Sequence, residues 1–429
     1  MKIRAALLAA SLFVTPAFAK DLERATPQST GMDAAAIDKM RASMKSLVDT
    51  GKRAGIVYAI AHKNKIVVME AVGKRDLEKN LPMEVDTIFH LASLSRVITA
   101  AAILTLVDEG KLKMDDPVSK YIPEFAQTQV VKEIKDGKAI LEPQKRPMTV
   151  RHLFTYTPGF GSAPNWPKDI VVKQGEVLAP DVSLKDGIAK LASYPLLTHP
   201  GDKWRYGTPG DVLGRVAEFA SGQPLDVFLK ERFFDKLGLK DMGFWTTQPE
   251  RLAAVYTTDK AGKLELTNVD RLSGFTRPTK QMSASGGLAG TVPEYLRFAQ
   301  LLVNGGTLDG KRVMKAETVK AMITRQTTPE QGMTYWYDPE RYQSVKGYAW
   351  GYAIGVRVDG VPHQMPGVSG DAGWAGFTNT WFFVDPKNEI AAVAMSQLVG
   401  TDEGAPVLTA LRTGVYEALG KKEAFDLNK

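Results

Sequence analysis

The stretch Thr87–Leu104, TIFHLASLSRVITAAAIL, decides how this chain is organised. A short β-prone run, Ile88–Leu91, leads to Ser93, a residue type favoured at helix N-caps, and an apolar run with helical period continues to about Glu109. Gly110 then ends the predicted helix. A serine at such a junction lies where unpaired backbone N–H groups and the positive end of the helix dipole stabilise negative charge. Ser93 is therefore either a helix cap, which is the commoner use, or a nucleophile, and the rest of the chain must decide.

The first nineteen residues have the composition of a signal peptide. Lys2 and Arg4 form a charged segment, Ala5–Val14 is apolar, and Ala17-Phe18-Ala19 provides small residues at a cleavage site before Lys20. The apolar run is too short to span a bilayer, and no other segment reaches spanning length. We expect a periplasmic or secreted protein cleaved between Ala19 and Lys20, with an uncleaved anchor as the alternative.

The composition excludes several classes of function. The chain has 429 residues and no cysteine, which rules out disulfides, a thiolate zinc site and a cysteine nucleophile. The net charge of +7 is spread along the sequence and gives no reason to expect a nucleic-acid partner. The five histidines lack metal-ligand spacing, and neither a dinucleotide fingerprint nor a Walker A motif occurs, so we expect no metal and no cofactor.

The remaining pattern predicts an α/β (α+β) fold with an antiparallel sheet flanked by helices and a second, mostly helical lobe. Strand signals occur near both ends of the chain and helical signals in the middle, so distant segments should complete one sheet. The expected helices are 33–50, 211–221, 225–237, 295–303 and 406–419, and the expected strands are 56–62, 66–71, 130–135, 138–141, 352–358, 380–384 and 390–396. Asn165-Trp166-Pro167 is expected in a surface loop that could wall a pocket.

Three short motifs follow one another along the chain in a fixed order. They are Ser93-Leu94-Ser95-Arg96, Tyr206-Gly207-Thr208 and Trp374-Ala375-Gly376, and no G-x-S-x-G nucleophile elbow occurs. Thr155–Gly159 and Ser285–Leu288 lie between them as supporting loops. In order and context these motifs resemble those of the serine β-lactamase and penicillin-binding-protein superfamily, specifically its class C-like family VIII carboxylesterase branch.

The resemblance implies a β-lactamase-like fold across residues 20–429. Its sheet lobe would comprise about 20–115 and 285–429, and its helical lobe about 116–284, with Ser93 between them. The implied chemistry is acyl transfer, in which Ser93 attacks a carbonyl and water later releases the acyl group. The backbone N–H groups of Ser93 and Phe377 would form the oxyanion hole, and Tyr206 would take and return the proton.

One residue departs from the family in a way that matters chemically. The family places a lysine one helical turn after the serine, whereas this chain has Arg96 and no S-x-x-K anywhere. Arginine stays protonated in proteins, so Arg96 cannot act as a general base. A cation close to Tyr206 still favours a phenolate, and we therefore assign Tyr206 as the base and Arg96 as its electrostatic support.

The substrate-binding residues implied by the resemblance are Trp374, Ala375, Gly376, Thr208 and Tyr156. Trp374 replaces a lysine that would pair with a substrate carboxylate, which favours a neutral ester with a small acyl group over a carboxylated β-lactam or peptide. Three functions remain open: ester hydrolysis, β-lactamase or D-alanyl peptidase activity, and ligand binding by a catalytically degenerate periplasmic protein. The sequence does not determine the oligomeric state.

Overall fold

The computed structural model describes residues 22–161, 177, 179, 181–267, 274–333, 347–359, 363, 365–400 and 406–426. The expected leader, residues 1–19, and the expected surface loop Asn165-Trp166-Pro167 lie outside these residues. Within the described helices, no segment is both long and apolar enough to cross a membrane.

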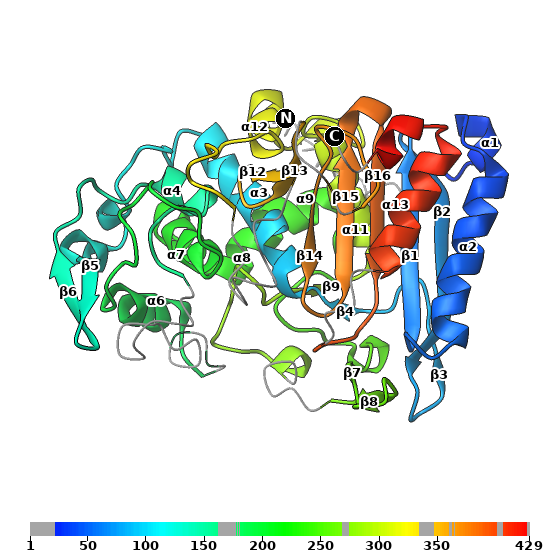
Figure 1. Cartoon of the computed structure of the whole chain (residues 1–429), viewed down its shortest axis with the longest axis horizontal. Helices are drawn as coiled ribbons and strands as arrows, with labels where there is room; N and C mark the ends of the chain where they lie inside the picture. The colour runs from blue at the N-terminus through cyan, green and yellow to red at the C-terminus, as the bar shows by residue number, and fades with distance from the viewer. Residues whose placement is uncertain are drawn as a thin grey trace, which may run out of the picture.

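A large antiparallel sheet is built from both ends of the chain (Figure 1). Within the described residues it has eight strands in the order β12-β13-β14-β15-β16-β1-β2-β3. The pairing of β1 with β16 joins segments more than 300 residues apart, with Val57 opposite Met395 and His62 opposite Ile390. The strands are β1 (Gly55–His62), β2 (Lys65–Asp76), β3 (Leu81–Pro82), β12 (Tyr348–Trp350), β13 (Gly355–Arg357), β14 (Ala372–Gly376), β15 (Thr380–Asp385) and β16 (Ile390–Met395).

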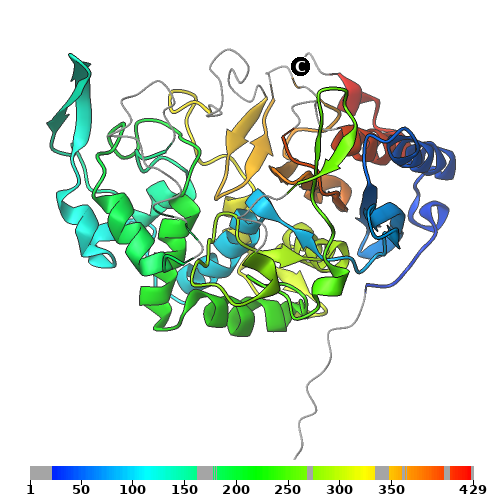
Figure 2. The same cartoon turned by 90° about the horizontal axis from the view of Figure 1, so that it is seen from below.

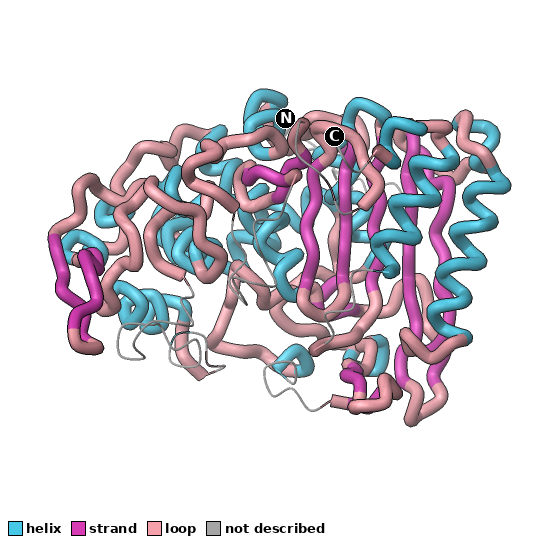
Figure 3. Tube along the Cα trace, in the orientation of Figure 1, coloured by secondary structure: helices cyan, strands magenta, loops and turns pink. Residues whose placement is uncertain are grey.

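Helices cover both faces of this sheet, and every residue of its central strands β1 and β16 is therefore buried. In β1, Ile56, Tyr58 and Ile60 pack in one apolar core with α2 (Ala34–Asp49) and α13 (Pro406–Ala418). These two helices run side by side over one face of the sheet, with α2 against β1 and β2 and α13 against β16 (Figure 3). The alternate residues of β1 face the opposite way, toward α11 (Val292–Val303). This alternation is the two-residue period of a strand, and it separates two apolar cores.

The middle of the chain forms a mostly helical region beside the sheet (Figure 2). The helix expected over 225–237 is two α-helices joined by a π-helical turn, Lys230–Phe234. The strands expected over 130–135 and 138–141 are present as a hairpin that stands apart from the main sheet. The elements of this region are β5 (Val130–Lys135), β6 (Lys138–Glu142), α4 (Val150–Phe154), α6 (Leu184–Ala192), α7 (Pro209–Ser221), α8 (Leu225–Leu229) and α9 (Asp235–Leu237). The hairpin of β7 (Tyr256–Thr258) and β8 (Leu264–Leu266) lies instead next to the large sheet, where Tyr256 pairs with Leu398.

The helix α3 (Ser95–Asp108) occupies the centre of the molecule between the sheet and the helical region (Figure 1). Every residue from Ser95 to Leu106 is buried, so this is a core helix rather than an amphipathic surface helix. It contacts α7 on one side and α12 (Ala316–Met322) on another. Gly110, with φ +71°, follows the last turn as expected.

One expected strand, 352–358, is wrong in its first half. Ala353 has φ +59° and lies in the turn between β12 and β13, so the segment is the turn and second strand of a hairpin. The remaining short elements are α1 (Pro27–Thr30), β4 (Phe89–His90), β9 (Ala289–Gly290), β10 (Thr307–Leu308) and β11 (Lys311–Arg312).

Candidate active site

Ser93 lies in a 3-10 turn, Ala92–Leu94, between β4 and α3. Of the two uses considered for Ser93, the helix cap does not occur, because the N-cap residue of α3 is Leu94 and no side chain caps it. Ala92, directly before Ser93, has φ +47°, in the left-handed region that costs an L-residue about 1–2 kcal/mol. Such strain is held in place by its surroundings and is found most often at functional sites. The Ser93 hydroxyl is therefore left for a partner other than the helix backbone.

That partner is Arg96, one helical turn further along. Its Nη2 donates to Ser93 Oγ at 3.1 Å and its Nε donates to the Ser93 carbonyl at 3.1 Å. Its Nη1 donates to Tyr156 Oη at 2.8 Å and to the Gly207 carbonyl at 3.5 Å. Arg96 is only 4% exposed, so its charge acts on these groups with little screening by water.

Tyr206 lies beneath the guanidinium of Arg96. The Arg96 Cζ is 4.2 Å from the centre of the Tyr206 ring, a cation–π contact. Trp374 Nε1 donates to Tyr206 Oη at 3.3 Å, and the two rings are 5.7 Å apart. The structure thus brings together Arg96 of α3, Tyr206 from the segment before α7 and Trp374 of β14.

Tyr156 occupies a different position from the one expected of a substrate-binding residue. It is 0% exposed and packs against Trp204 and Trp350, with its hydroxyl used by Arg96. Burial raises the pKa of Tyr156 well above its ordinary range, so it remains a neutral phenol. Its position indicates that it holds Arg96 in place through this hydrogen bond rather than contacting a substrate.

A buried carboxyl group lies behind this arrangement. Asp211, near the start of α7, is 0% exposed and accepts from Ser283 Oγ at 2.7 Å and from the Ser285 amide at 3.2 Å. Burial raises the pKa of Asp211, while these hydrogen bonds and the charge of Arg96 oppose that rise. In the sequence, Asp211 was marked only as an acidic residue at the start of an expected helix, and nothing else pointed to this buried position.

The third motif ends next to the serine turn. A side chain at Gly376 would collide with the Leu91 carbonyl and with Thr380 Oγ1 and would lie 3.3 Å from Ala92 Cβ. Glycine therefore lets β14 approach the Ala92–Leu94 turn and sets the following residue, Phe377, beside it. The Phe377 side chain is 42% exposed.

The other two expected binding residues are less directly placed. Ala375 packs with the α2 and α13 core, on the face opposite to Trp374, because successive residues of a strand alternate. Thr208 is buried at the N-cap position of α7, where its carbonyl accepts from the Asp211 amide at 3.0 Å.

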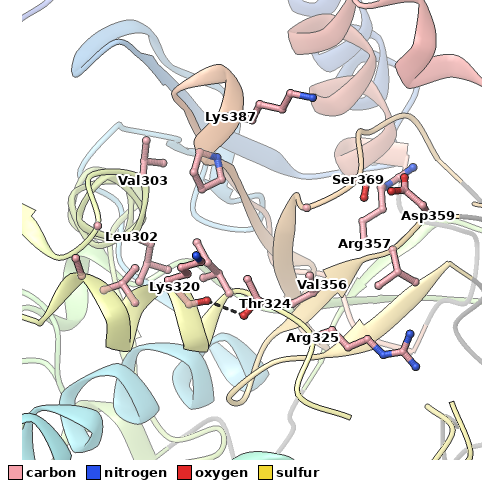
Figure 4. Close-up of a pocket in the computed structure, with 17 residues that line it drawn as sticks. Leu302, Val303, Lys320, Thr324, Arg325, Val356, Arg357, Asp359, Ser369 and Lys387 are labelled. Atoms are coloured by element: carbon pink, nitrogen blue, oxygen red, sulfur yellow. Dashed lines mark hydrogen bonds between the residues drawn. The ribbon is translucent and has the colours of Figure 1, made fainter. Parts of the chain in front are cut away.

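A cavity of about 570 Å³ lies elsewhere, lined by parts of α11, α12, β13 and the turn after β15 (Figure 4). It is at the Asp385 end of β15, whereas Ser93 is near the Thr380 end, and Ser93 does not line it. Its basic residues, including Lys320, Arg325 and Lys387, extend in different directions (Figure 4). Among the residues that the structure places, no group of three or more acidic or histidine side chains is arranged to hold a metal ion.

Together, the antiparallel sheet, the adjoining helices and a serine at the start of the buried helix between them define the class of serine β-lactamase-like proteins. A family model described as Beta-lactamase matches residues 40–416, and the chain belongs to this family. It is 30% identical over 417 residues to Protein Rv1367c of Mycobacterium tuberculosis, covering 90% of this chain and 99% of that protein. It is 27% identical to Esterase EstB of Burkholderia gladioli, covering 91% and 98%.

Solved structures agree on the fold. EstCE1, described as a hydrolase with promiscuous acyltransferase activity, matches with a TM-score of 0.74 and 24% identity, covering 89% of this chain and 98% of that chain. Unliganded simvastatin synthase LovD of Aspergillus terreus matches with a TM-score of 0.75 and 20% identity, covering 90% and 98%.

Proposed function

We propose that this protein is a serine hydrolase that cleaves carboxylic esters through an acyl-enzyme at Ser93. The observation that carries the proposal is the hydrogen bond from Arg96 Nη2 to Ser93 Oγ at 3.1 Å, made beside the ring of Tyr206. A buried cation that donates to a hydroxyl stabilises the oxyanion which that hydroxyl becomes when it loses its proton. The family's esterase relatives make an ester the first substrate class to test.

The proposed reaction uses Tyr206 in its phenolate form as the base. The proton of Ser93 passes to Tyr206 Oη as Ser93 Oγ bonds to the ester carbonyl carbon, and the charge moves to the carbonyl oxygen. The N–H groups of Ser93 and Phe377 would stabilise that oxyanion. The intermediate then expels the alcohol, which takes the proton from Tyr206, and a water molecule releases the acyl group by the same steps.

Arg96 holds a fixed positive charge throughout this cycle. It stays protonated, and so it stabilises the anionic forms of Ser93 and Tyr206 in turn without exchanging a proton itself. Trp374 Nε1 donates to Tyr206 Oη at 3.3 Å and would stabilise the same phenolate. This division of roles replaces the family lysine with a permanent cation and leaves proton transfer to the tyrosine.

The first experiment measures hydrolysis of a short-chain nitrophenyl ester by the wild type and by Ser93→Ala and Arg96→Met. We expect Ser93→Ala to lower kcat at least about 10³-fold because the nucleophile is lost, and Arg96→Met to lower it about 10²-fold. Arg96→Lys is the matched variant that keeps the charge at neutral pH. If the wild type and Ser93→Ala are equally inert while Arg96→Lys hydrolyses the ester, the natural protein is a disabled member of the family and the proposal fails.

A β-lactam arm tests the substrate class separately. Trp374 lies where a lysine would bind a substrate carboxylate, so turnover of a chromogenic β-lactam should be slower than that of the ester. A reversed ratio that still depends on Ser93 would keep the nucleophile and reassign the activity to β-lactam hydrolysis.

Export through the leader is a further part of the proposal. It is tested by expressing the full chain in a Gram-negative host and recovering the protein from the periplasm. An N-terminus at Lys20 supports cleavage after Ala19, and an intact Met1 contradicts it.

A further inference from the structure

Two buried threonines, which follow the third motif in the sequence, hydrogen-bond to the residues that precede Ser93. Thr378 Oγ1 donates to the His90 carbonyl at 2.7 Å, and Thr380 Oγ1 donates to the Leu91 carbonyl at 3.0 Å. Both threonines are 0% exposed, and His90 and Leu91 are 4% and 0% exposed. No water competes for these carbonyls, so each hydroxyl holds its partner at a defined place.

These two side-chain hydrogen bonds occur where a neighbouring β-strand would form backbone hydrogen bonds. His90 is the last residue of β4, which pairs with β9 on one side, and the amide of the next residue, Leu91, donates to the Leu288 carbonyl at 2.9 Å. On the side toward β14 and β15, side-chain hydroxyls supply the donors that a neighbouring strand would otherwise supply. The backbone that leads into the left-handed Ala92 is thus fixed from two directions.

The turn that carries Thr378 and leads into Thr380, the first residue of β15, is itself held by neighbouring segments. Asn379 has φ +63°, and its amide donates to the Gly376 carbonyl at 2.9 Å. Its side chain donates to the Leu398 carbonyl at 2.8 Å and accepts from Arg53 Nη2 at 2.9 Å. Phe377 lies between Gly376, which packs on Leu91, and Thr378. The Phe377 amide has little freedom to move relative to the Ala92–Leu94 turn.

We propose that Thr378 and Thr380 are positioning residues that set the Phe377 amide at a fixed distance from Ser93. The inference rests on the proposed function, in which the Ser93 and Phe377 amides stabilise the same oxyanion. Such donors act only when they are fixed before the charge develops. A small displacement therefore lowers the rate of acylation without changing how a substrate binds in its ground state.

The test compares Thr378→Val, which has nearly the same shape but no hydroxyl, with Thr378→Ser, which restores the hydroxyl. Thr128→Val is the matched control, because Thr128 is also a buried threonine that donates to a carbonyl of another segment, Ala192, but in the helical region. We expect Thr378→Val to lower kcat about tenfold with KM within twofold, Thr378→Ser to recover most of the rate, and Thr128→Val to leave kcat unchanged. Thr380→Val serves as a second variant if Thr378→Val does not fold.

Two further results separate this inference from the proposed function. If the wild type shows Ser93-dependent turnover but the valine variants keep full kcat, or if serine does not rescue Thr378→Val, the positioning role is overturned and the function stands. If the wild type is inert, the proposed function fails, and the positioning role of Thr378 is then tested by amide hydrogen exchange. Faster exchange over residues 376–380 in Thr378→Val than in Thr128→Val supports the positioning role, and equal exchange overturns it.

Discussion

Arg96 illustrates how one side chain can be kept in place by several weak partners. Its guanidinium contacts Ser93, Tyr156 and Gly207 through hydrogen bonds and Tyr206 through the ring face. A lysine ammonium carries three donors on a flexible stem and cannot reproduce this planar fork. The buried partners therefore fix the position of the Arg96 charge, and removing one of them should weaken the hydrogen bond from Arg96 to Ser93.

Tyr156→Phe tests that dependence at the level of a single atom. The change leaves one buried guanidinium N–H without its acceptor, at a cost of about 1–3 kcal/mol, while the ring packing is kept. We expect kcat for the ester to fall about fivefold to tenfold with little change in KM. The control is Tyr58→Phe, which removes a hydroxyl bound to Glu70 Oε2 at 2.7 Å on the other face of the sheet and should leave kcat unchanged. Equal rates for the two variants would contradict the supporting role of Tyr156.

The site residues differ in how far sequence could predict them. The i to i+3 spacing places Arg96 and Ser93 on the same side of a helical turn, but the sequence does not show whether the Arg96 side chain points toward Ser93. The left-handed backbone of Ala92 was not predictable, because alanine carries no signal for a positive φ and the strain is imposed by surrounding segments. The roles of Thr378 and Tyr156 depend on which residues face them across the fold, and a single sequence contains no record of that.

At the scale of elements, local chemistry predicted most of the strands but missed one turn. Lys63 and Asn64 have φ +53° and +61°, as a tight hairpin turn requires, and the strands on either side were correctly anticipated. The segment 352–358 has strand-forming residues as well, yet the Tyr352 amide donates to the Met322 carbonyl at 3.0 Å and the Gly351 amide donates to the Ile354 carbonyl at 2.8 Å, so the chain turns there instead. The order of the strands in the sheet could not be predicted from local sequence, because neighbouring strands such as β1 and β16 are far apart in the chain and meet only in the folded protein.

A buried ion cluster joins α13 to the sheet and permits a prediction at this scale. Asp371, just before β14, accepts from Arg412 of α13 at 2.9 and 3.1 Å and lies 3.3 Å from Arg357 of β13. Asp371→Asn would leave two buried guanidinium groups without a compensating anion, which costs about 3–5 kcal/mol. We expect a correspondingly large fall in the free energy of unfolding, measured by urea titration.

The matched control for this cluster is an exposed ion pair on the same helix. Glu417 of α13 pairs with Lys39 at 3.1 Å, with the Lys39 side chain 69% exposed. Glu417→Gln should change the free energy of unfolding by less than about 1 kcal/mol. If Asp371→Asn is no more destabilising than Glu417→Gln, the buried cluster does not anchor α13.

For the whole molecule, buried titratable groups make stability depend on pH in opposite directions. Burial lowers the pKa of His90 to about 4, below the ordinary histidine value of about 6.5. Between these two values the unfolded chain binds a proton that the folded chain does not, so stability falls as the pH is lowered from 6.5 to 4. The contribution of His90 to this loss is about 3 kcal/mol.

His90→Leu removes this titration and keeps an apolar side chain against Phe275, whose ring centre is 4.5 Å from that of His90. We expect the variant to lose less stability than the wild type between pH 6.5 and pH 4, measured as the urea midpoint at each pH. Parallel pH profiles for the two proteins would show that His90 does not titrate with a lowered pKa.

Glu294 in α11 changes the pH dependence of stability in the opposite direction to His90. Burial raises the pKa of Glu294 to about 7, so the folded chain holds a proton that the unfolded chain has already lost, and stability falls as the pH rises from about 4.5 through 7. Glu294 Oε1 accepts from the Asp241 amide at 2.6 Å, and a glutamine oxygen can accept the same bond. Glu294→Gln should therefore have a flatter urea-midpoint profile from pH 5 to pH 8 than the wild type.

The exposed Glu317→Gln on α12 provides the comparison, because both variants lose one carboxylate and only the buried one should change the slope. The same slope in both would mean that the Glu294 carboxyl is already ionised in the folded protein at pH 5, which would contradict its raised pKa.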